Sequence, residues 1–159
     1  MIPVKLTYTE IRVASNIATE RNIGNLANGR EPIAGQPPNA IWGDHFTGVC
    51  GELAVAKYLG LYPNMDDEPN HLGDVGWLEV RTTRKPENRC LLLRPGEADP
   101  NRPYVLVLGI PPNLLLAGWL FGREAMQPKY RGAPNGRNPC FMVPPEELHP
   151  MARLPWADS

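Results

Sequence analysis

Apolar positions in the first 60 residues recur with a helical period, in two stretches that contain no proline. In the first stretch Thr7 and Glu10 form a capping-box signature, and the apolar spacing that follows predicts a helix ending near Gly24. In the second stretch Asp44 is the expected N-cap and Gly60 the expected end of a helix with a broad apolar face. A long polar loop separates the two.

From residue 74 onward the pattern changes to a period of two, which is typical of strands. The predicted strands cover 74–83, 90–94, 104–110, 114–121 and 140–143. Short linkers between the first three strands predict an antiparallel meander. A short helix is expected at 122–130 and a helical turn at 144–151. The order of the elements predicts a mixed α/β fold, and 159 residues are enough for one domain.

Composition narrows the class of protein. The 19 prolines and 15 glycines exclude an all-helical bundle, and no apolar run approaches the ~20 residues of a membrane span. The chain begins without a signal-peptide pattern. Its three cysteines lie far apart, which argues against a disulfide scaffold and favours a reducing compartment, the cytoplasm. A glycine loop for a nucleotide cofactor is absent, so we expect no organic cofactor.

Charge is unevenly distributed although the net charge is only −1. Residues 81–137 hold ten Lys or Arg against four Asp or Glu, which favours a surface that faces a polyanion such as DNA. The candidates for phosphate contacts are Arg84, Lys85, Arg89 and Arg94. A solvated basic hairpin is the alternative interpretation of these four residues.

Three acidic residues have apolar or glycine-rich surroundings. Glu52 has Gly48 and Ala56 one turn away in the second helix, which leaves room for a carboxylate that reaches into a cleft. Glu79 shares a strand face with Arg81, and Asp74 enters the same strand between glycines. The structural alternatives are an exposed helix glutamate, a cross-strand ion pair and a turn aspartate.

Two further residues are weaker candidates for nucleic-acid contacts. His45 lies on the Glu52 face of the helix and could orient a phosphate or a water. Trp77 lies on the Glu79 face of the strand and could stack on a base. The alternatives are that His45 stands at the start of the helix without a functional role and that Trp77 serves only in packing.

The segments GELAVAKYLG, GDVG and EVRTT, taken in that order, resemble the active-site frame of the PD-(D/E)XK nuclease superfamily, and more narrowly its small phage-type members. The resemblance implies a restriction-endonuclease-like core of helix, three-stranded meander, helix and strand. This core would span 44–145, preceded by a helix and loop at 1–43 and followed by a tail at 146–159. For a phage-encoded member the compartment would be the host cytoplasm.

The resemblance also implies roles for individual residues. Asp74 and Glu79 would bind Mg²⁺ or Mn²⁺, together with the backbone carbonyl of Val80 and the acidic helix residue Glu52. Arg81 stands where the family has its motif lysine, and Gly73 stands where it has a proline. Oxygen donors of this kind suit a magnesium ion.

The spacing of the two strand carboxylates sets a geometric condition. In a regular strand Asp74 and Glu79 would face opposite sides, because they are five positions apart. We therefore expect a bulge or kink at 75–77, where Gly76 permits one, and convergence of Glu52, Asp74 and Glu79 on one site.

Three functions remain open at this point. The first is metal-dependent hydrolysis of DNA, for which a second copy of the chain or a partner subunit would be needed to cut both strands. The second is a catalytically silent nuclease fold that binds DNA or protein, with Arg81 marking the lost activity. The third is an accessory protein that acts by protein contact, in which the acidic residues are structural.

Overall fold

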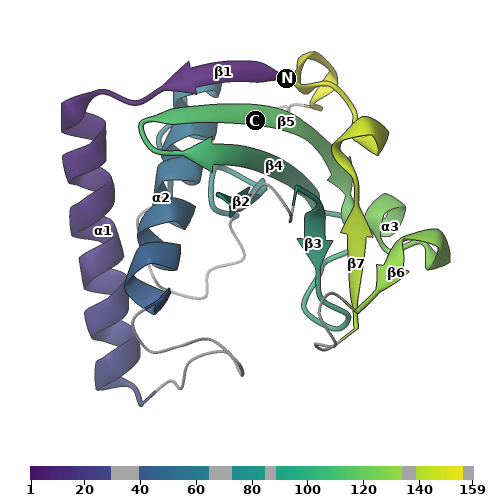
Figure 1. The fold of residues 1–159 in the computed structure, drawn as a ribbon, viewed down its shortest axis with the longest axis horizontal. Helices are drawn as coiled ribbons and strands as arrows, with labels where there is room; N and C mark the ends of the chain where they lie inside the picture. The colour runs from purple at the N-terminus through teal and green to yellow at the C-terminus, as the bar shows by residue number, and fades with distance from the viewer. Residues whose placement is uncertain (30–39, 65–72, 85–88, 134–138, 156–159) are drawn as a thin grey trace.

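The computed structural model describes residues 1–29, 40–64, 73–84, 89–133 and 139–155. In Figure 1 two long helices descend on the left, a small sheet descends on the right, and a larger curved sheet runs across the top. The class is mixed α/β, as the sequence predicts.

Both predicted helices are present. Helix α1 spans Tyr8–Ala27, and its N-cap Thr7 forms the predicted capping box with Glu10. It runs past Gly24 to end at Ala27. Helix α2 spans Ala40–Leu59 and stops at Gly60, whose φ of 68° is a conformation that glycine adopts at little cost. The prediction of Asp44 as N-cap is wrong, because the helix begins four residues earlier.

The larger sheet has the strand order β1-β5-β4-β2. Its members are β1 (Ile2–Lys5), β5 (Asn113–Phe121), β4 (Pro103–Ile110) and β2 (Glu79–Thr83). Strand β1 was not predicted, and it pairs antiparallel with the first half of β5. The β4–β5 hairpin forms the centre of the sheet.

The predicted three-stranded meander is wrong. Strand β2 pairs with β4 in parallel, with Glu79 beside Tyr104. The intervening strand β3 (Leu91–Leu93) leaves this sheet and pairs antiparallel with β7 (Cys140–Val143). Two parallel strands cannot be joined by a tight hairpin, and the excursion through β3 supplies the longer connection.

The second sheet has the order β3-β7-β6, with β6 at Arg131–Gly132. The predicted helix at 122–130 is reduced to the single turn α3 (Gly122–Ala125) and a 3-10 turn at Pro128–Tyr130. The predicted turn near the C-terminus is a 3-10 helix at Pro145–Glu147, and another follows at Met151–Arg153.

Strand β4 is buried on both faces and separates two apolar clusters. Val105 and Val107 face the cluster that contains α1 and α2, whereas Tyr104, Leu106 and Leu108 face the cluster that contains β3 and β7. Side chains of neighbouring strands in register share a face. Glu79 and Arg81 therefore project toward the second sheet, and Val80 and Thr82 project toward α2.

Candidate functional site

The site begins with a tight turn at the entrance to β2. Val75 and Leu78 exchange two backbone hydrogen bonds of 3.2 and 3.0 Å, and Gly76 has a φ of 58°. The kink expected at 75–77 is thereby confirmed. The turn reverses the chain between Asp74 and Glu79, so the two side chains need not project from opposite faces as they would in a straight strand.

Gly73 is an integral part of this turn. Its N–H donates to the carbonyl of Gly76 at 2.8 Å, and a Cβ at this position would lie 2.2 Å from the carbonyl oxygen of Leu78. A proline here would lose the hydrogen bond and collide with that oxygen. The glycine in place of the family's proline is therefore required by the local backbone.

Three oxygen atoms lie around one nitrogen, Nη1 of Arg81. This nitrogen lies 3.3 Å from Oε2 of Glu79, 3.2 Å from the carbonyl oxygen of Val80 and 3.9 Å from Oδ2 of Asp74. These oxygen atoms belong to three of the four residues that the family resemblance assigns to a metal, and Glu52 is the fourth. The Arg81 guanidinium also lies over the Tyr104 ring, 5.5 Å from its centroid, and its side chain is 43% exposed.

The surroundings of Asp74 shift its pKa. Burial, followed by the charges of Glu52 and Glu79, raises its pKa to about 6, against a hydrogen bond from Val80 N–H and the charge of Arg81. That hydrogen bond to Asp74 Oδ2 is 2.7 Å long. The positive charge of Arg81 thus compensates the negative charge around Asp74 only in part.

Glu52 is buried at the contact between α1 and α2. Both of its carboxylate oxygens accept hydrogen bonds from Arg21 of α1, at 2.8 and 3.1 Å. Its charge acts on Asp74, so that the two groups are electrostatically coupled.

A close contact between α2 and β2 sets the position of Glu52. A Cβ on Gly51 would lie 1.9 Å from Oγ1 of Thr82, so only glycine allows the helix to approach this strand as it does. One turn away, the position of Gly48 is open, and a Cβ added there would meet no atom within 4 Å. The helix therefore touches the strand immediately beside Glu52.

Arg21 and Arg102 are members of the site that sequence reasoning missed. Arg102 precedes β4 and donates to Oε1 of Glu79 at 2.7 Å. Each arginine reaches its carboxylate from a distant part of the chain, and neither belongs to a recognisable local motif. The only sequence signal was the excess of basic residues after residue 81, which includes Arg102.

The donor set suits a hard divalent cation. Asp74, Glu79 and the Val80 carbonyl offer oxygen atoms, and the cationic nitrogen of Arg81 already lies where these oxygens meet. Glu52 adds its negative charge beside Asp74, and its two carboxylate oxygens accept hydrogen bonds from Arg21. Within the described part of the chain, no group of three or more His, Cys, Asp or Glu side chains is placed to hold a metal ion on its own.

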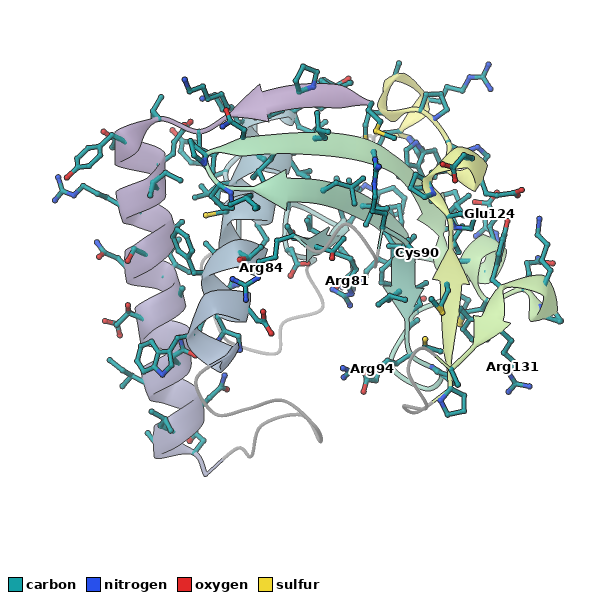
Figure 2. The ribbon with its side chains drawn as sticks, in the orientation of Figure 1. Arg81, Arg84, Cys90, Arg94, Glu124 and Arg131 are labelled. Carbon is teal, nitrogen blue, oxygen red and sulfur yellow. The ribbon has the colours of Figure 1, made fainter. Side chains whose placement is uncertain are left out.

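The predicted phosphate-contacting residues that the structure describes are exposed arginines. Figure 2 shows Arg81, Arg84 and Arg94 on the side of the molecule between the two long helices and the second sheet. Arg84 pairs with Asp44 of α2 at 3.4 Å, and Arg94 pairs with Glu97 at 3.7 Å. All four side chains of these pairs remain at least 41% exposed. Arg89 is also exposed, and Lys85 lies outside the described residues.

The two weaker candidates differ in their surroundings. Trp77 packs against the first apolar cluster, with its ring 6.1 Å from that of Phe121, which is the contact of a packing residue. His45 is half-buried, and its Nδ1 has no hydrogen-bond partner among the described residues. Among the described residues, neither His45 nor Trp77 forms a hydrogen bond with a carboxylate of the site.

Comparison with known proteins adds no family to these observations. No family model, no curated protein and no solved structure matches the chain. No helix in the described residues is long and apolar enough to cross a membrane.

Proposed function

We propose that the protein hydrolyses phosphodiester bonds of DNA with a bound Mg²⁺ or Mn²⁺ ion. The observation that carries the proposal is the convergence of Asp74, Glu79 and the Val80 carbonyl on one cationic nitrogen. The raised pKa of Asp74 supports the proposal, because it shows that Arg81 does not fully neutralise the negative charge around Asp74. A divalent ion would neutralise the remainder. The proposal rests on these donors and the family resemblance, and the strand order does not contribute to it.

Asp74, Glu79 and Val80 would hold the ion. When bound, it would lower the pKa of a water and neutralise charge that develops on the scissile phosphate. Arg81 remains protonated at any working pH and cannot act as a base. Its guanidinium, freed from the carboxylates, can donate two parallel hydrogen bonds to a phosphate. Arg84, Arg89 and Arg94 would bind the flanking DNA backbone.

Metal binding and nicking of supercoiled DNA test the proposal. We expect the wild type to bind Mn²⁺ in a calorimetric titration and to nick the plasmid, and we expect a chelator to abolish nicking. Asp74→Asn should lose both activities because it removes a charged ligand. Glu146→Gln, at an exposed carboxylate of the 3-10 helix Pro145–Glu147, is the matched control and should retain both. A wild type that neither binds Mn²⁺ nor cuts DNA contradicts the proposal.

The contacts of Arg81 with Glu79 and the Val80 carbonyl also support a second function, in which Arg81 takes the place of a metal ion as the cation of the site. The protein would then be a catalytically silent module that binds DNA or protein. Variants at Arg81 separate the two. In an active nuclease Arg81→Lys keeps measurable cleavage, whereas Arg81→Ala loses about 10²–10³ in rate, as expected for one preorganised electrostatic contact. A silent wild type whose Arg81→Lys variant gains cleavage supports the second function.

A further inference from the structure

Arg21 connects helix α1 to the site, although it lies outside the residues 44–145 that carry the family resemblance. Its guanidinium binds both carboxylate oxygens of Glu52, at 2.8 and 3.1 Å. The two side chains are 21% and 9% exposed, so the pair is largely shielded from water. A two-pronged contact of this kind fixes the orientation of a carboxylate as well as its distance.

The same guanidinium also reaches the backbone of Asp74 through one intermediate residue. Nη2 of Arg21 donates to the carbonyl oxygen of Asn64 at 3.4 Å, and the N–H of Asn64 donates to the carbonyl oxygen of Asp74 at 2.8 Å. Asn64 follows the end of α2 and Asp74 precedes the turn into β2. One arginine therefore links the side chain of Glu52 to the backbone of Asp74.

We propose that Arg21 is a positioning residue that fixes Glu52 relative to Asp74, which makes α1 part of the functional unit. The effect of Arg21 on metal binding rests on the function proposed above. Without Arg21 the carboxylate of Glu52 would be buried without its counter-ion, and the segment at Asn64 would lose a contact to α1. Lysine delivers a single point charge and cannot replace both prongs.

Amide hydrogen exchange tests this role independently of metal and of activity. The probes are the N–H of Asn64 and the N–H of Val80, which bond to the carbonyl and to the carboxylate of Asp74 respectively. The amides of Val105 and Val107 in buried β4 report global stability. The variants are Arg21→Gln, the conservative Arg21→Lys, and Arg12→Gln.

Arg12→Gln is the matched control, since Arg12 lies on the same helix, is exposed and contacts only the ring of Tyr8 among the described aromatic residues. We expect Arg21→Gln to accelerate exchange at Asn64 and Val80 by at least about 10-fold more than in β4, and to weaken Mn²⁺ binding by about 10–100-fold. Arg21→Lys should fall between this variant and the wild type. Arg12→Gln should match the wild type in both measurements.

Exchange that rises equally at all four amides, or that does not rise at all, overturns the positioning role and leaves Arg21 a structural ion pair. Because Arg21→Lys keeps the charge, it provides the comparison if Arg21→Gln fails to fold. A wild type that binds no Mn²⁺ contradicts the proposed function, while the exchange at Asn64 and Val80 still decides the role of Arg21.

Discussion

At the scale of single residues, the site is a set of carboxylates that arginines compensate unequally. Glu52 is bound through both oxygens by Arg21, and Glu79 receives hydrogen bonds from Arg81 and Arg102. Asp74 has the weakest cationic contact, at 3.9 Å, and its pKa is raised to about 6. The free energy of unfolding is therefore sensitive to the charge of this one side chain.

The raised pKa of Asp74 predicts a pH-dependent gain from Asp74→Asn. An acid whose pKa is higher in the folded state than in the unfolded state contributes fully below its unfolded value of 3.8, and its contribution is lost as the pH rises through about 6. Removal of its charge should therefore stabilise the protein by about 2–3 kcal/mol at pH 8 and by much less at pH 4. Asparagine still accepts the hydrogen bond from Val80.

Urea unfolding of the wild type and Asp74→Asn at pH 4 and pH 8 measures this difference. The exposed-site variant Glu97→Gln controls for the loss of one negative charge from the molecule. An equal change in unfolding free energy at both pH values would show that the ionisation of Asp74 is not linked to folding.

At the scale of elements, the contact between α2 and β2 controls the position of Glu52. Gly51 lets the helix backbone approach Thr82, and the adjacent residue along the helix carries the carboxylate. The turn at 73–78 does the same for Asp74, through Gly73 and Gly76. Three glycines thus define the geometry of the charged residues beside them.

This contact predicts that replacing Gly51 or Gly48 of the same helix by alanine changes the stability of the protein in opposite directions. Gly51→Ala would place a methyl group against Oγ1 of Thr82 and should destabilise the protein by about 1–3 kcal/mol. Gly48→Ala meets open space and should stabilise it by about 0.5–1 kcal/mol, because alanine loses less backbone entropy in a helix. Thermal or urea unfolding of both variants measures the contrast. Equal effects would mean that α2 does not pack on β2 through Gly51.

At the scale of the whole molecule, the central sheet separates two apolar clusters, and three arginines lie on the side between the long helices and the second sheet. Figure 2 places Arg81, Arg84 and Arg94 there, while Arg131 lies at the far edge of the second sheet. The sequence indicated an excess of basic residues in 81–137, and the fold brings Arg81 and Arg102 from this segment into contact with Glu79.

The salt dependence of DNA binding tests whether this side binds phosphates. A triple alanine variant of Arg84, Arg89 and Arg94 should bind DNA of any sequence more weakly. Its slope of log K against log salt should flatten by about 0.9 for each lost phosphate contact. The control variant replaces Arg12, Arg131 and Arg153, which removes the same charge from other places on the surface. Identical slopes for the two variants would contradict a specific phosphate-binding side.

Much of the local structure follows from the sequence alone. The capping box at Thr7 and the glycine at 60 define ends of helices through contacts within one turn, so a short window contains the information. The same holds for the kink at 75–77 and for the grouping of Asp74, Glu79 and Arg81, which lie within eight consecutive residues. Their chemistry as a pair of carboxylates with a cation was predictable for this reason.

Only the tertiary structure decided which strands pair and which distant residues complete the site. The short apolar run at 90–94 identifies a strand. The choice between β2 and β7 as its neighbour depends on where its buried leucines pack, and they pack in the cluster with β7. Arg21 and Arg102 meet their carboxylates across 31 and 23 residues of sequence. An arginine on an ordinary helix or turn carries no local sign of its partner, because the partner is selected by the packing of the intervening elements.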